Sequence, residues 1–305
     1  MTRLADLAEL VRAPAALSVP GDVLSGAAAA GALGRRTPAL AGASVLLYWA
    51  GMAANDWADR RLDAVERPER PIPSGRVRPA TAFGVAVGLT AAGLAVAGAA
   101  GGRRATAVAV PLAATIWGYD LLAKNTAAGP AVMAACRGLD VLLGASVGPA
   151  RGRGRREAPP AARGLVRALP AGPGLVRALP AALTVAAHTW TVTALSRREV
   201  SGADRRLPRA TLAGTALVAA TALGRPDPVP VALAAGYAGR YGAAQARVLA
   251  DPSPARVRAA VGAGITGLPA LQGALTARAG NRLLGLAVAA AAPLGRRLAR
   301  LISPT

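Results

Sequence analysis

The segment that decides the fold is residues 37–76, which reads TPALAGASVLLYWAGMAANDWADRRLDAVERPERPIPSGR. Its first part, 37–54, is an uncharged apolar run of the length that crosses a bilayer as one helix. The part that follows carries three aspartates within eight residues and then arginines interleaved with prolines. The sequence therefore predicts a membrane-spanning helix that ends in a dense cluster of opposite charges.

Apolar runs of similar length recur along the whole chain. The protein has 305 residues, of which 53% are hydrophobic and only 17% are charged. This composition is typical of a polytopic membrane protein, so we predict an all-α integral membrane bundle of nine or ten transmembrane helices in a single domain, residues 1–305. The expected spans are 13–34, 37–54, 80–100, 104–123, 129–148, 178–196, 209–224, 228–249, 256–277 and 281–299.

The net charge of +21 does not indicate nucleic-acid binding. The arginines lie mostly between the apolar runs, where they orient the helices and meet anionic membrane lipids. The chain leaves no basic soluble domain to hold DNA or RNA. Its one cysteine, Cys136, excludes an internal disulfide and a cysteine-based metal site.

Three polar connections separate the apolar runs. The connections 55–79 and 197–209 mix acids with arginines, and the positive-inside rule places both in the cytoplasm of a bacterial-type plasma membrane. The third, 149–177, is a polar insertion that holds seven arginines and conflicts with this orientation. It contains a tandem repeat, GLVRALPAGP at 164–173 and GLVRALPAA at 174–182, which we interpret as a local duplication.

The aspartates of the first connection have the spacing of a cation site. Asp56, Asp59 and Asp63 occur at positions i, i+3 and i+7, so on a helix they share one face, with Asn55 at its edge. Carboxylates placed together repel one another unless a cation lies among them, and oxygen ligands suit Mg²⁺. The sequence therefore predicts a Mg²⁺ site here.

The arginines that follow suit an anionic ligand. Arg67 and Arg70 can each bind diphosphate oxygens with two parallel hydrogen bonds, and the prolines between them stiffen the turn. The alternative is a solvated helix end in which Asp59 pairs with Arg60, or Asp63 with Arg67. The spacing and the adjoining spans favour the ligand site.

Three motifs resemble those of the UbiA superfamily of intramembrane prenyltransferases, in the order that this family shows. The first is Asn55-Asp56-x-x-Asp59-x-x-x-Asp63 with its arginine-proline continuation, and the second is Tyr119-Asp120-x-x-x-Lys124. The third lies at 196–206, where the family places a second acidic motif after its sixth helix. The resemblance thus spans most of the chain.

The resemblance implies a helical bundle whose acidic motifs meet over a central cavity. In this family Mg²⁺ ions bind the diphosphate of an isoprenyl donor, and a lipid-soluble acceptor in the cavity attacks the allylic carbon. It further implies the following roles here: Asp56, Asp59, Lys124 and Asp120 as catalytic; Asn55, Arg67, Arg70, Lys124 and Tyr119 for the diphosphate; and Asp56, Asp59, Asp63, Glu199 and Asp204 for metal.

The third motif departs from the family pattern. Glu199 can stand for its first acid, but the residue four positions later is Ala203, and Asp204 lies about 140° away from Glu199 on a regular helix. A bend at Gly202 is needed to bring the two acids together. This departure keeps two alternatives open, namely a non-enzymatic relative that binds an isoprenoid lipid and a transporter with buried charges.

Buried polar residues elsewhere suggest where the acceptor lies. Asp22, inside the first apolar run, and Arg12 beside it are candidates for the acceptor cavity, since an intramembrane acid is by default a functional candidate. The alternative is a helix break near Pro20 that leaves Asp22 in water. Arg137 has the spacing to pair with Asp140. We interpret the lone histidine, His188, as a hydrogen-bonded interior residue.

Overall fold

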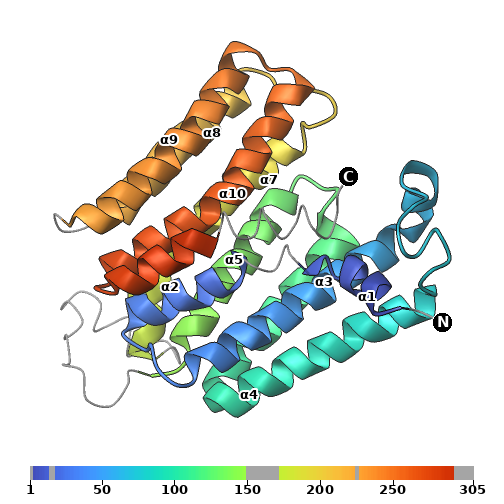
Figure 1. Ribbon diagram of the computed structural model, residues 1–305, viewed down its shortest axis with the longest axis horizontal. Helices are drawn as coiled ribbons and strands as arrows, with labels where there is room; N and C mark the ends of the chain where they lie inside the picture. Colours follow the sequence, from blue (N-terminus) through green and yellow to red (C-terminus); the bar gives the residue numbers. More distant parts are fainter. Residues whose placement is uncertain (1–2, 14–17, 149–171, 224–226, 292–305) are drawn as a thin grey trace.

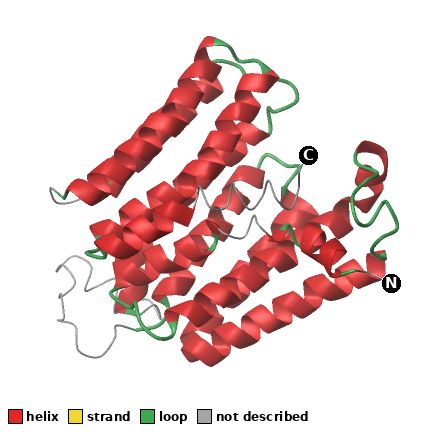
Figure 2. Cartoon of the chain, viewed as in Figure 1, coloured by secondary structure: helices red, strands yellow, loops and turns green. Residues whose placement is uncertain are grey.

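Helices are the only regular elements in the described part of the computed structural model, residues 3–13, 18–148, 172–223 and 227–291 (Figure 2). The prediction of an all-α fold is thus confirmed. The elements are α1 (Leu4–Leu10), α2 (Pro20–Ala30), α3 (Thr37–Glu66), α4 (Pro79–Gly118), the π-helix η2 (Tyr119–Ala123), α5 (Gly129–Ala145), α7 (Pro173–Ser196), α8 (Arg206–Ala222), α9 (Pro228–Ala250), α10 (Pro254–Arg278) and a last helix, Arg282–Ala291.

Prolines set the starts of most helices. In α2, α3, α4, α5, α7, α9 and α10 a proline occupies one of the first two positions. Proline fits there because the first N–H groups of a helix have no partner within it. Helix α7 begins at Pro173, ahead of the expected span 178–196, because the second copy of the repeat folds as its first turns. Nearly all of the first copy lies outside the described residues.

The long helix α4 is a hairpin of two antiparallel arms. Gly102 has φ 60° and ψ −154°, which breaks the helix. The indole Nε1 of Trp117 donates to Oγ1 of Thr90, 27 residues earlier, at 3.0 Å. A continuous helix would separate these residues by about 40 Å. The arms therefore correspond to the separate spans predicted at 80–100 and 104–123.

The helices form a membrane bundle with two large apolar cores and a smaller apolar cluster around Leu10. By length and composition, α3, the α4–η2 segment and α7 can each cross a membrane. One core is built mainly from α2 to α5 and the other mainly from α7 to α10, which Figure 1 shows on opposite sides of the molecule. Between them lies α2, which packs on α5, α7 and α10. At 11 residues α2 extends only about 16 Å, much less than the predicted span 13–34.

A close contact between α3 and the second arm of α4 requires glycine at position 51. A methyl group at Gly51 would lie 2.6 Å from Cγ2 of Ile116 and 3.4 Å from Oδ2 of Asp120. At Gly42, on the same helix, no atom lies within 4 Å of such a methyl group. Gly51 therefore lets α3 approach the residues that precede and include the Tyr119–Lys124 motif.

We predict that Gly51→Ala destabilises the protein and that Gly42→Ala does not. Forcing a methyl group into a packed helix contact costs about 1–3 kcal/mol, whereas an exposed glycine replaced by alanine in a helix gains up to about 1 kcal/mol. Thermal unfolding in detergent, followed by circular dichroism, measures both variants. Equal melting temperatures for Gly51→Ala and the wild type would show that this contact is not tight.

Candidate functional site

The first acidic motif lies on the polar end of α3, and arginines hold its buried carboxylates. Nη1 of Arg70 lies 2.7 Å from Oδ2 of Asp63 and 3.4 Å from Oδ1 of Asp56. Nη2 of Arg12 donates to the same Oδ1 of Asp56 at 2.8 Å. The side chains of Asp56 and Asp63 are only 5% and 3% exposed. Their mutual repulsion is thus offset by shared guanidinium groups.

The second motif pairs with the first through two parallel contacts. The side-chain amide of Asn55 donates to Oδ1 of Asp120 at 3.1 Å, and Nζ of Lys124 donates to Oδ1 of Asp59 at 2.5 Å. Asn55 and Asp59 are four positions apart in the sequence, and their partners Asp120 and Lys124 are also four positions apart. The contacts join the end of α3 to η2, where the amide of Lys124 bonds to the carbonyl of Tyr119. Such π-helical turns are frequent at functional sites, and nothing in the sequence analysis indicated this one.

The arginine-proline segment, residues 67–76, folds back onto the acidic motif. Ile72 and Val77 are buried in the apolar cluster that also holds Leu10, and the amide of Val77 bonds to the carbonyl of Pro71 at 2.8 Å. This turn directs Arg70 into the motif. Arg67, by contrast, is 53% exposed and lies 3.8 Å from Asp63.

The N-terminal helix α1 is fastened to the same turn. Arg76 donates to Asp6 at 2.9 Å and to both oxygens of Glu9 at 2.6 and 3.0 Å. The backbone N–H of Arg3 and the guanidinium of Arg76 hold the pKa of Asp6 below its ordinary value. The segment after α1 places Arg12, which has a φ of 47°, on Asp56. The N-terminal segment therefore closes one side of the acidic motif.

A cavity of about 490 Å³ adjoins this cluster. Arg12 both lines the cavity and pairs with Asp56, so the cavity reaches the acidic motif. The other lining residues come from the segment before α2, the middle of α3, η2, α5, α7 and α10, and most are apolar or aromatic. They include Tyr48, Trp49, Met52, Tyr119, Met133, Arg137, His188, Val192, Ile265 and Leu268.

Asp22 lies behind this cavity, and it is fully buried rather than in water. Its Oδ2 faces Nε of Arg137 at 2.7 Å, as an ion pair rather than a well-aligned hydrogen bond. Its Oδ1 accepts from Nε2 of Gln272 at 2.7 Å. Asp140, the partner expected for Arg137 from spacing, instead accepts from the hydroxyl of Ser44. Of the two residues predicted for the acceptor cavity, Arg12 lines this cavity, whereas Asp22 contacts its lining residue Arg137.

His188 is a hydrogen-bonded interior residue, as predicted. It is 1% exposed, and its Nδ1 lies 2.8 Å from the hydroxyl of Tyr237. The ring also packs edge-on against Tyr237 and Tyr241. Its position on the cavity wall could not be read from the apolar run in which it lies.

The region of the third motif is a turn, so helical spacing does not apply to its acids. Helix α7 ends at Ser196, and Gly202 has φ +78°. Asp204 accepts from the amide of Leu207 at 3.0 Å, at the start of α8, and Arg258 donates to the carbonyl of Glu199. Burial raises the pKa of the Glu199 carboxyl, and Arg258 opposes this shift. Metal binding by Glu199 and Asp204 stays a prediction.

The carboxylates of the first motif have the chemistry that Mg²⁺ prefers. Asp56 and Asp59 each use Oδ1 in their ion pairs, and among the described residues no hydrogen bond or ion pair uses their Oδ2. Both oxygens of Asp63 face arginines. Nowhere in the described ranges do three or more His, Cys, Asp or Glu side chains gather as a metal site. Asp56 and Asp59 are therefore the carboxylates with an oxygen free for a cation.

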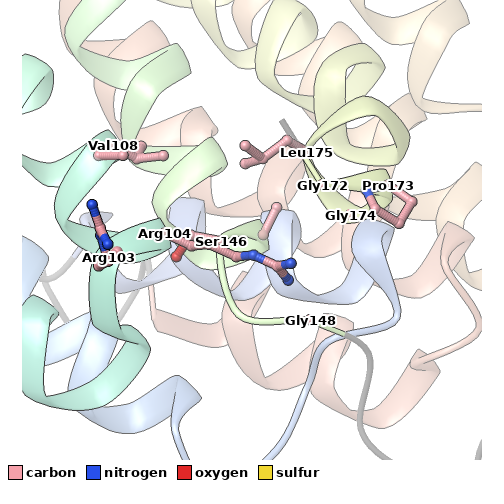
Figure 3. A pocket seen from close by; sticks show the side chains of 11 residues that line it. Arg103, Arg104, Val108, Ser146, Gly148, Gly172, Pro173, Gly174 and Leu175 are labelled. Carbon is pink, nitrogen blue, oxygen red and sulfur yellow. The ribbon is translucent and has the colours of Figure 1, made fainter. Parts of the chain in front are cut away.

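A second cavity, of about 480 Å³, lies away from the motifs (Figure 3). It is lined by Arg103 and Arg104 after the α4 break, by Ser146 after α5, and by Pro173 at the start of α7. The acidic motif lies at the C-terminal end of α3, and Lys124 follows η2 at the end of the second α4 arm, whereas this cavity lies at the start of that arm. This cavity is therefore separate from the site at Asp56–Lys124.

The fold and the site together define an intramembrane helical bundle that holds a paired acidic and basic cluster beside a mainly apolar cavity. The family model described as "UbiA prenyltransferase family" matches residues 21–261. The chain belongs to this family. The resemblance drawn from the three motifs is thereby confirmed.

Similar proteins of known function match over shorter stretches. Digeranylgeranylglyceryl phosphate synthase of Methanothrix thermoacetophila is 42% identical over 95 residues, which are 30% of this chain and 36% of that protein. The bacteriochlorophyll synthase 33 kDa chain of Cereibacter sphaeroides is 39% identical over 112 residues, 34% of this chain and 36% of that one. The matches thus span about a third of these relatives' lengths.

Solved structures share the fold over almost the whole chain. A structure described as digeranylgeranylglyceryl phosphate synthase in membranes aligns with a TM-score of 0.65 and 15% identity, over 92% of this chain and 99% of that one. A UbiA homolog from Archaeoglobus fulgidus, solved with GPP and Mg²⁺, aligns with a TM-score of 0.61 and 13% identity, over 93% and 99%. At these identities the likeness establishes the fold.

We predict that Arg70→Ala destabilises the protein far more than Arg67→Ala. Removing Arg70 leaves the buried carboxylates of Asp56 and Asp63 without one of the cations that neutralise them. Breaking a buried ion pair in this way costs about 3–5 kcal/mol. Arg67 makes an exposed pair worth at most about 1 kcal/mol. Chemical denaturation in mixed micelles compares the two. Similar losses for both variants would mean that Arg70 does not hold the motif together.

Proposed function

We propose that the protein is a Mg²⁺-dependent intramembrane prenyltransferase, which moves an isoprenyl group from an allylic diphosphate to a lipid-soluble acceptor. The observation that carries this proposal is the pairing of the first two motifs beside the cavity. Asn55 contacts Asp120 and Lys124 contacts Asp59, which gathers carboxylate oxygens and cations where a diphosphate needs both. Family membership supports the same chemistry.

The residues of the cluster divide into two roles in this proposal. Asp56 and Asp59 hold Mg²⁺, which supplies positive charge to neutralise the leaving diphosphate. Lys124 and Arg70 donate to diphosphate oxygens, as do the side chains of Asn55, Tyr119 and Arg67 at the edges of the site. Asp63 keeps Arg70 in place through its 2.7 Å contact. Glu199 and Asp204 are proposed as further metal ligands from the third motif.

The reaction needs the cavity as much as the cluster. The bond between the allylic carbon and the diphosphate oxygen breaks, and both electrons leave with the diphosphate. An electron pair of the acceptor forms the new bond to that carbon, and the acceptor's proton passes to the released diphosphate. The aromatic and apolar lining keeps water from the allylic cation, while Arg70 and Lys124 stabilise the charge on the leaving group.

The proposed membrane orientation follows from the charge of the donor. Allylic diphosphates are charged and meet the site from the aqueous side. We therefore propose that the end of α3, the turn at 67–78 and the 197–205 segment face the cytoplasm. The arginines of both connections agree with this orientation under the positive-inside rule.

A second candidate function is a relative that binds isoprenoid diphosphates without transferring the prenyl group. Ala203 at the position of a family acid favours it, as does the engagement of Asp204 by the amide of Leu207. The two candidates differ in turnover, because a binder would hold Mg²⁺ and the diphosphate without releasing inorganic diphosphate. A transporter is disfavoured, since the charged cluster lies at a helix end rather than along a path between broken helices.

We predict that the protein in lipid nanodiscs releases diphosphate from allylic donors only with Mg²⁺ and an acceptor mixture. Asp59→Asn should reduce release by about 100-fold or more, because it removes charge from the site that neutralises the leaving group. Asp227→Asn is the control, since Asp227 pairs with Arg282 at 2.7 Å after α8, outside the site. It should leave the rate unchanged.

Two results distinguish the candidates. Full release in EDTA, or in the Asp59→Asn variant, would overturn the prenyltransferase proposal. Tight Mg²⁺-dependent binding of the allylic diphosphate, without release for any acceptor, would support the binding relative instead.

A further inference from the structure

The cavity wall contains a cation that the diphosphate cluster does not use. Arg137 on α5 lines the cavity, although only 6% of its surface is exposed. Its Nε faces Asp22 at 2.7 Å, and its Nη2 donates to the carbonyl of Ser18 at 3.4 Å. Tyr48 is a further close neighbour of the guanidinium, but by distance and angle no hydrogen bond or ion pair in the described ranges uses Nη1. One edge of the guanidinium is therefore available to a molecule in the cavity.

The charge of Arg137 is already neutralised. Asp22 is 0% exposed and pairs directly with Arg137, so the pair leaves no excess of positive charge for an anionic group. Moving a carboxylate or phosphate from water into this cavity would cost several kcal/mol without a matching cation.

Arg12, the other cationic side chain on the wall, is neutralised as well. Its guanidinium lies 2.8 Å from Oδ1 of Asp56. Both cationic side chains of the cavity wall are thus paired with a carboxylate. A neutral oxygen can still accept a hydrogen bond from Arg137, because that requires a donor and not an excess of charge.

The rest of the wall suits a flat molecule. Tyr48, Trp49 and Tyr119 supply aromatic faces, and Arg137 itself lies 5.4 Å from the ring centroid of Tyr48. Met52 and Met133 are adaptable apolar neighbours. An aromatic lining favours a flat aromatic ligand through ring stacking, and a few polar groups, among them Arg137 and the hydroxyls of Thr189 and Ser196, can orient it.

We propose that the acceptor is an uncharged aromatic molecule whose phenol or carbonyl oxygen binds Arg137, and that Asp22 excludes acceptors with a carboxylate or phosphate by neutralising that arginine. This inference rests on the proposed function and names its acceptor class. Arg137 is then an acceptor-binding residue, and Asp22 is a positioning and specificity residue that acts through it.

A pair of probes that differ by one carboxylate tests the proposal. 1-Naphthol and 1-hydroxy-2-naphthoate are titrated by calorimetry into the protein in zwitterionic nanodiscs, without donor or metal, and protein-free nanodiscs provide the blank. The wild type should bind 1-naphthol at least about tenfold more tightly. Asp22→Asn preserves the shape of the site but frees the charge of Arg137, so this preference should fall at least about tenfold or reverse.

Two further variants keep the test decisive if a single change prevents folding. Asp22→Asn with Arg137→Gln removes the ion pair as a unit and should weaken 1-naphthol binding about tenfold without creating a preference for the carboxylate. Asp227→Asn, in the exposed pair with Arg282, should leave both affinities unchanged. A role for Asp22 in stability alone would lower both affinities together and leave their ratio intact.

The proposal is overturned if the wild type binds the carboxylate probe as well as 1-naphthol, or if Asp22→Asn leaves the ratio unchanged. These outcomes are separate from those of the proposed function. Loss of the probe preference with normal Mg²⁺-dependent diphosphate release would contradict only the acceptor class. An intact preference without release would contradict the transferase.

Discussion

Carboxylates brought together at the end of a membrane helix repel one another, and the cations that offset this repulsion determine the architecture of the site. Arg70 bridges Asp56 and Asp63, while Lys124 reaches Asp59 from a helix 65 residues away in sequence. Each of these contacts fixes a different segment against α3: the arginine-proline turn and the π-helix. The site is thus a set of neutralised charges in which a diphosphate and its metal would exchange with existing partners.

The local pattern of apolar and polar residues explains much of the fold. The lengths of the apolar runs predicted nearly every helix, including the two arms that meet at Gly102, because a span must match the bilayer and a glycine permits the reversal. The family motifs predicted which ends of the helices carry the candidate site. The π-helix at Tyr119–Ala123 could not be foreseen, since its pattern of apolar and polar residues differs little from that of an α-helix.

Which buried charges pair with each other depends on how the helices pack. The spacing of residues in the sequence does not show this. Arg137 lies three residues before Asp140, yet it pairs with Asp22 because the short helix α2 packs between the two halves of the bundle. Likewise, Glu199 and Asp204 leave helical geometry because the chain turns at Gly202, next to the carbonyl of Pro252. The motif residues Asn55, Asp59, Asp120 and Lys124 could be named from the sequence, whereas the pairing of Asp22 with Arg137 depends on how α2 packs against α5.

The central claim is that the α3–η2 contact forms the diphosphate site. The most direct measurement is calorimetric binding of a non-reactive allylic thiodiphosphate, with and without Mg²⁺, to the wild type, Asp59→Asn, Lys124→Met and the double variant. The account predicts Mg²⁺-dependent binding that weakens in each single variant, with losses that are not additive because the two side chains are in contact. Unchanged affinity in both single variants, or equal affinity in EDTA, would contradict it.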